Sequence, residues 1–121
     1  MLALVERWVE LLAADRFDDA LALLAPRPDW TVKLLKTVIG NYGFIEPRGD
    51  GKTFTVSPIA AAKGDRPRAE LVWLDRERND LLGYVCFALP LNGEWSDVTA
   101  LFDLLASPSG VVLALDDVHV L

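Results

Sequence analysis

The sequence predicts an α+β fold in which N-terminal helices pack on one face of a curved antiparallel β-sheet. Two observations carry this prediction. Apolar residues recur at helical spacing only before residue 41, and residues 81–121 read as consecutive strands joined by short turns. Helices followed by an antiparallel meander are typical of α+β domains. With 121 residues, the chain is expected to form one domain over residues 1–121.

Three helices are expected in the first third of the chain. Apolar residues at helical spacing predict the first near residues 3–14, with its charged residues on the opposite side. Asp15 can cap a second helix that ends at Pro26, and Asp29 can cap a third that ends at Gly40.

The middle of the chain is expected to be largely irregular. Residues 53–57 can form a short strand, and residues 58–67, rich in Pro and basic residues, read as a mobile connection. A strand is expected over residues 69–74, with Leu71 and Trp73 on the core side.

Asn92-Gly93 between two apolar runs predicts a two-residue hairpin turn, because both positions tolerate a positive φ. Such a turn fixes the register of the flanking strands. It places Phe87 opposite Val98, and it puts Phe87 and Phe102 on one apolar face.

A second hairpin is expected through the turn-forming residues 106–110, with Leu105 opposite Val111. Two turns placed independently then agree on one apolar face. That face continues through Val112, Ala114, Val118 and Val120.

The composition narrows the classes of partner. A net charge of −6 and a pI near 4.6 oppose binding to nucleic acid or to an anionic membrane surface. The single cysteine, Cys86, can form no internal disulfide, and no apolar run approaches a membrane span. We therefore expect a cytoplasmic protein. One histidine and one cysteine on separate strands predict neither a metal site nor a cofactor.

One group of candidate catalytic residues lies on the face away from the apolar core. The register puts Asp97 opposite His119 and Thr99 opposite Asp117, with Tyr84, Cys86, Trp95 and Asp103 nearby. A carboxylate beside an imidazole can poise the histidine as a general acid or base. The alternative is a cross-strand ion pair on a solvated or dimer-forming face.

Asp116 is the other catalytic candidate, because the register puts it on the apolar face. A carboxylate there is strongly destabilised unless it is hydrogen-bonded, neutralised or lining a polar pocket. The alternative is a β-bulge at Asp116-Asp117 that turns the side chain outward.

The face away from the helices is also expected to join two copies of the chain. A contiguous apolar patch on an acidic protein usually marks a contact surface, and twofold symmetry would make it self-complementary. The pocket or interface candidates are Tyr84, Thr99, Leu101, Leu113 and Asp117. The expected patch comprises Leu82, Tyr84, Leu101, Leu105, Val111, Leu113 and Leu115.

The order of elements resembles that of the cystatin-like, NTF2-like (SnoaL-like) superfamily, and residues 4–8 and 17–20 are similar to its opening helices. This resemblance implies a pocket between sheet and helices, as in some members, and dimers through the sheet, as in many. It assigns no catalytic residue. Residues 93–99 and 116–120 also resemble the ends of bacterial proteins of unknown function.

Two functions remain open. The first is a non-catalytic binding or interaction module, whose partner could be a basic protein or a small apolar ligand. The second is a small NTF2-like pocket enzyme that uses Asp116 or the Asp97/His119 pair for proton transfer or dehydration. An empty space between helices and sheet would favour the enzyme, and a filled one the interaction module.

Overall fold

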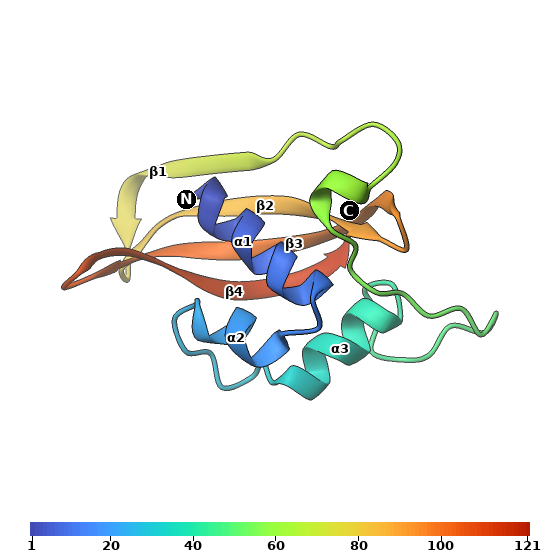
Figure 1. The fold of residues 1–121 in the computed structure, drawn as a ribbon. Coiled ribbons are helices and arrows are strands. Elements are labelled where there is room, and N and C mark those ends of the chain that lie inside the picture. Colours follow the sequence, from blue (N-terminus) through green and yellow to red (C-terminus); the bar gives the residue numbers. More distant parts are fainter.

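The computed structural model describes residues 1–121 as three α-helices, a short 3-10 helix and a four-stranded antiparallel sheet (Figure 1). Each strand pairs with the next along the chain, which gives the order β1-β2-β3-β4. The α+β class expected from the sequence is confirmed. The elements are α1 (Leu2–Ala13), α2 (Phe17–Ala22), α3 (Val32–Gly40), η1 (Ile59–Ala61), β1 (Glu70–Arg78), β2 (Leu81–Leu91), β3 (Glu94–Ser107) and β4 (Gly110–Val120).

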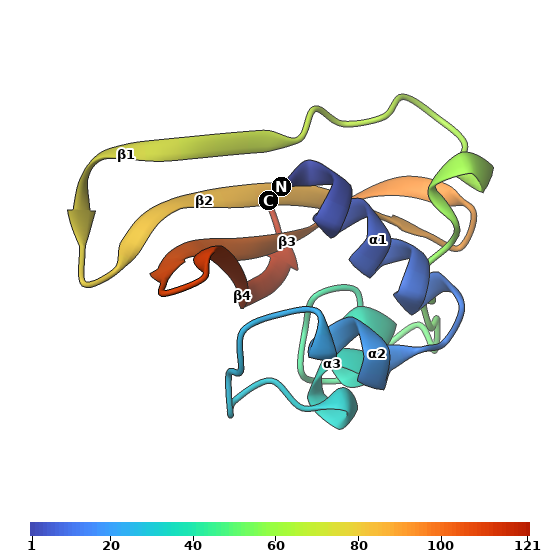
Figure 2. The ribbon, with the colours of Figure 1, turned by 60° about the vertical axis from the view of Figure 1, so that its left-hand side comes forward.

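All three helices lie on one side of the sheet, which we call the inner side. Helix α1 lies across the strands, whereas α2 and α3 lie toward β4 and away from β1 (Figures 1 and 2). The chain after α2 is tied to β4, because the Ala25 amide donates to the Leu113 carbonyl at 2.7 Å. The helices therefore leave the β1 end of the inner side uncovered.

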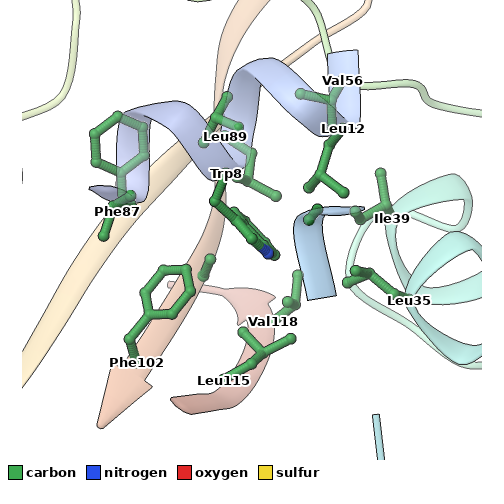
Figure 3. Packing of buried hydrophobic residues seen from close by; sticks show 14 of the residues in the cluster. Trp8, Leu12, Leu35, Ile39, Val56, Phe87, Leu89, Phe102, Leu115 and Val118 are labelled. Atoms are coloured by element: carbon green, nitrogen blue, oxygen red, sulfur yellow. The ribbon is translucent and has the colours of Figure 1, made fainter. Parts of the chain in front are cut away.

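The space between helices and sheet is filled by large apolar side chains. Trp8 of α1 points at the sheet, and its ring meets Phe102 edge to face with centroids 5.0 Å apart (Figure 3). Leu35 and Ile39 of α3 complete the packing, at 0% and 2% exposure. Burial of this apolar surface is the main force that holds helices and sheet together.

The first hairpin forms as expected. Asn92 and Gly93 adopt φ values of 49° and 82°, and Leu91 lies opposite Glu94. Further from the turn the ladder is interrupted, where the Ser96 hydroxyl donates to the Leu89 carbonyl at 2.7 Å. This break advances β3 by two residues.

As a result, Phe87 lies opposite Ala100, and the expected pairing with Val98 is wrong. A shift of two residues keeps every side chain on its face. Phe87 and Phe102 are accordingly buried on the inner side, at 2% and 0% exposure.

The second hairpin is tighter than expected. Ser107 pairs with Gly110 across a two-residue turn, so Leu105 lies opposite Val112 and not Val111. This slip of one residue moves the side chains in the first half of β4 to the opposite faces of the sheet from those expected. Leu113 and Leu115 therefore enter the core, each at 1% exposure, and their expected place on the opposite face was wrong.

A β-bulge at Asp116 then adds a second residue to the slip, which returns the side chains after it to their expected faces. Leu115 pairs with Phe102 and Asp117 with Leu101, so Asp116 is the extra residue and is exposed. The Trp30 indole donates to the Asp116 carbonyl at 3.2 Å. The sequence allowed Asp116 either on the apolar face or on an outward β-bulge, and the structure has the bulge.

The remaining middle segments differ in part from expectation. Leu71 and Trp73 of β1 lie on the inner side as expected, but no helix reaches them, and they are 38% and 52% exposed. Residues 53–57 form no strand, and Val56 makes a single bridge to Leu91. Residues 58–67 are tied to α1, because Arg66 binds Glu6 at 2.9 Å.

Candidate functional site

The outer side of the sheet, opposite the helices, gathers most of the candidate residues. Strand alternation places there Glu70, Tyr84, Cys86, Thr99, Leu101, Asp103, Asp117 and His119. The sheet therefore separates an apolar inner side from an outer side of mixed chemistry.

His119 has a carboxylate partner, but a different one from that expected. Its Nδ1 lies 2.7 Å from Oδ2 of Asp117, two residues earlier on the same strand. Across the ladder His119 faces Thr99, and Asp117 faces Leu101. The expected Asp97/His119 pair is wrong, because the tighter second hairpin and the bulge at Asp116 together shift β4 by two residues along β3.

Asp97 instead ties a loop to the sheet. Its side chain accepts a hydrogen bond from the Tyr42 hydroxyl, and its backbone carbonyl accepts one from the Leu121 amide at 3.1 Å. The bond to Asp97 raises the pKa of the Tyr42 phenol. Asp97 thus has a structural contact and lies apart from His119 in the ladder.

An acidic cluster surrounds the bulge in β4. Although the Asp116 side chain is exposed, partial desolvation by the surrounding protein raises the pKa of its carboxyl, and repulsion from Asp103 and Asp117 raises it further. Arg27, from the loop after α2, reaches past β4 and binds Asp103 at 2.8 Å. The charge of Asp103 is therefore compensated, whereas Asp116 has no such ion pair.

Two other polar candidates are partly enclosed. Thr99 is 4% exposed and donates to the Asp97 carbonyl at 3.3 Å. Burial, together with the neighbouring Glu70, raises the pKa of the Cys86 thiol. A thiol of this kind is a poor nucleophile at neutral pH, since the thiolate is the reactive form.

Of the expected apolar patch, three members remain on the outer side: Tyr84, Leu101 and Leu105. Leu82 lies where the register of β2 and β3 shifts and packs against the core. Val111 points to the inner side near the β3–β4 turn and is 37% exposed. Trp95, expected beside this patch, packs on the inner side against Phe87, with ring centroids 6.3 Å apart. Val112 and Ala114, which were expected on the apolar inner face, instead take outer positions opposite Leu105 and Asp103, so the outer patch differs in membership from the one expected.

The surface has grooves at the sides of the helix layer. One of about 310 Å³ runs between α3 and β4 and has His119 and Asp117 in its wall. A larger one, of about 490 Å³, is lined by α1, α3 and residues 54–56, with Phe17 and Lys36 at its edge. Sequence reasoning missed this larger groove, because its walls come from segments distant along the chain.

No group of three or more histidine, cysteine or acidic side chains is arranged to hold a metal ion. None of the helices combines the length and apolar character needed to cross a membrane. Comparison with protein-family models, curated proteins and solved structures finds no match to this chain.

Proposed function

We propose that the protein is a non-catalytic interaction module on an NTF2-like scaffold, and that it acts through the outer side of its sheet. The observation that carries this proposal is the contrast between the two sides. The inner side is filled by Trp8, Phe102 and Phe87, each at 2% exposure or less. A pocket enzyme of this architecture would need that space for its substrate.

The outer side, in contrast, has no helix layer, although Arg27 binds Asp103 there and Pro67 and Arg68 border Cys86 and Thr99. The helices lie on the inner side (Figure 2). Residues 58–67 are tied to α1 on that side by two contacts: Arg66 binds Glu6, and the Ile59 amide donates to Glu10 Oε1 at 2.8 Å. This leaves Leu101 and its apolar neighbours half-buried without a covering element. Contiguous apolar surface of this kind favours a contact site.

The occupant we favour is a second copy of the chain. A twofold axis through the outer side brings the same leucines of both copies together, and it needs no charge of opposite sign on the partner. Asp103 lies within the patch, but its ion pair with Arg27 reduces the cost of burying it. Asp117 and His119 then form a polar rim.

A basic protein is the alternative occupant. The chain has a net charge of −6, and Asp116 and Asp117 project at the β4 bulge without an arginine or lysine partner. The negative electrostatic field of these charges accelerates the encounter with a cationic partner, and added salt weakens it. This partner would approach the edge of the outer side and not its leucines.

Three glutamate substitutions separate these outcomes. Leu101→Glu should give a folded monomer, because Leu101 is half-buried on the outer side. Leu113→Glu should fail to fold, because Leu113 is 1% exposed in the core. Val111→Glu is the matched control on the inner side and should stay dimeric. A dimer that survives Leu101→Glu overturns the proposed interface.

The second candidate is a small acid–base enzyme. One observation favours it: the 2.7 Å contact between His119 and Asp117 lies in the wall of a groove of about 310 Å³. A panel of dehydration and isomerisation substrates, assayed with the unmodified chain and with His119→Gln, tests it. Turnover by the unmodified chain that is lost in His119→Gln would support the enzyme and contradict the interaction module.

A further inference from the structure

The largest groove of the molecule lies on the helix side and is independent of the outer side of the sheet. It is bounded by the end of α1, the start of α2, α3 and residues 54–56, and its volume is about 490 Å³. Small-molecule sites commonly occupy roughly 300–1,000 Å³. The groove is therefore large enough for a ligand of modest size.

The walls of this groove are mainly apolar. Leu12 and Val56 form part of its lining and belong to the core, at 3% and 6% exposure. Phe17 and Phe54 add two half-buried aromatic rings. An apolar ligand segment placed here would lose contact with water along its length.

One cation is placed at this apolar surface. Lys36 Nζ, from α3, lies 5.1 Å from the centre of the Phe17 ring and 3.5 Å from Asp15 Oδ1. The Lys36 and Asp15 side chains are 51% and 79% exposed. An ion pair this exposed contributes little to stability, so water or another anion can replace Asp15 at low cost.

We propose that this groove binds a small amphipathic carboxylate. The apolar body of the ligand lies along Leu12, Phe54 and Val56, and its carboxylate takes the place of Asp15 at the Lys36 ammonium. A single negative charge suits the site, since Asp15 remains close and repels a more highly charged group. A ligand with a cationic head meets Lys36 and is disfavoured.

The probe for this proposal is decanoate, with 1-decanol and decylamine as matched ligands that differ only in the head group. Calorimetry and amide chemical shifts should report saturable binding of decanoate, with shifts at Phe17, Phe54 and Val56. Lys36→Met, which keeps most of the apolar stem, should weaken decanoate about tenfold or more and leave decanol unchanged. Lys33→Met, on the exposed side of the same helix, should have no effect.

Asp15→Asn gives a test of opposite sign. Asp15 has a φ of 58°, which asparagine tolerates, so the variant should fold. Removing the competing carboxylate should tighten decanoate binding several-fold. Equal binding of decanoate and decylamine, no effect of Lys36→Met, or shifts confined to the outer side of the sheet would each overturn the proposal.

Discussion

Trp8 and Phe102 meet edge to face between α1 and β3, with ring centroids 5.0 Å apart and an interplanar angle of 88°. Both side chains are fully buried. Edge-to-face contacts of this kind add to the stabilisation that burial itself provides. The contact joins the helix layer to the sheet, and it occupies the space in which a ligand chamber would otherwise lie.

Truncating either phenylalanine of the core should markedly lower the stability of the fold. Phe102→Ala or Phe87→Ala should lower the free energy of unfolding by about 3 to 5 kcal/mol, because each leaves a cavity in a packed core. Trp73→Ala is the control, since Trp73 is 52% exposed and should cost much less. Chemical denaturation measures all three, and equal losses at Phe102 and Trp73 would contradict the described packing.

The bulge at Asp116 should make stability depend on pH. The pKa of this carboxyl is raised in the folded protein, so folding favours the protonated form, and that contribution is lost as the pH rises through the folded pKa. Asp116→Asn should therefore be more stable than the unmodified chain at neutral pH, and the difference should shrink below about pH 4. Asp65→Asn, in an exposed loop, is the control. Thermal melts at several pH values give the comparison, and a variant that is less stable at neutral pH would speak against this assignment.

The Tyr42–Asp97 bond should contribute modestly to stability. Tyr42→Phe removes a hydrogen bond to an exposed carboxylate, for which we expect a loss of about 1 kcal/mol at neutral pH. Because the pKa of Tyr42 is raised in the folded state, the bond stabilises the fold below about pH 10 and is lost above it. Denaturation of both proteins should therefore show a difference that fades in alkali. A difference in stability between the two proteins that grows as the pH rises would contradict this prediction.

Cys86 should react slowly with thiol reagents at neutral pH, since burial and Glu70 raise its pKa. Glu70→Gln should speed the reaction by removing the nearby negative charge. Glu77→Gln, further along β1, should not. Rates with a coloured disulfide reagent test this, and rapid labelling of the unmodified folded chain would show a thiolate that the structure does not explain.

The sequence predicted the first hairpin well because Asn92-Gly93 admits one turn geometry. Beyond the interruption near Ser96, the faces of β2 and β3 were mostly predicted correctly although their pairing was not, since the interruption inserts two residues and two is the period of a strand. Trp95, which precedes the interruption, was placed on the wrong face. An insertion of one residue would have exposed Phe102.

The first half of β4 could not be predicted in the same way. Residues 111–115 are all apolar, so alternation gives no preference for either face, and the turn at 107–110 admits more than one loop length. The slip displaced Leu113 and Leu115, and with them much of the expected outer patch. The bulge at Asp116 then returns Asp117 and His119 to the outer side, and the sequence had left this bulge as one of two alternatives.

The central claim is that the outer side of the sheet joins two copies of this chain. The most direct test is the mass of the unmodified protein in solution, measured by sedimentation equilibrium or light scattering across the micromolar range. The account predicts a particle of twice the chain mass of 13.3 kDa, which falls to the monomer mass in Leu101→Glu. A particle of 13.3 kDa at every concentration of the unmodified chain would contradict it.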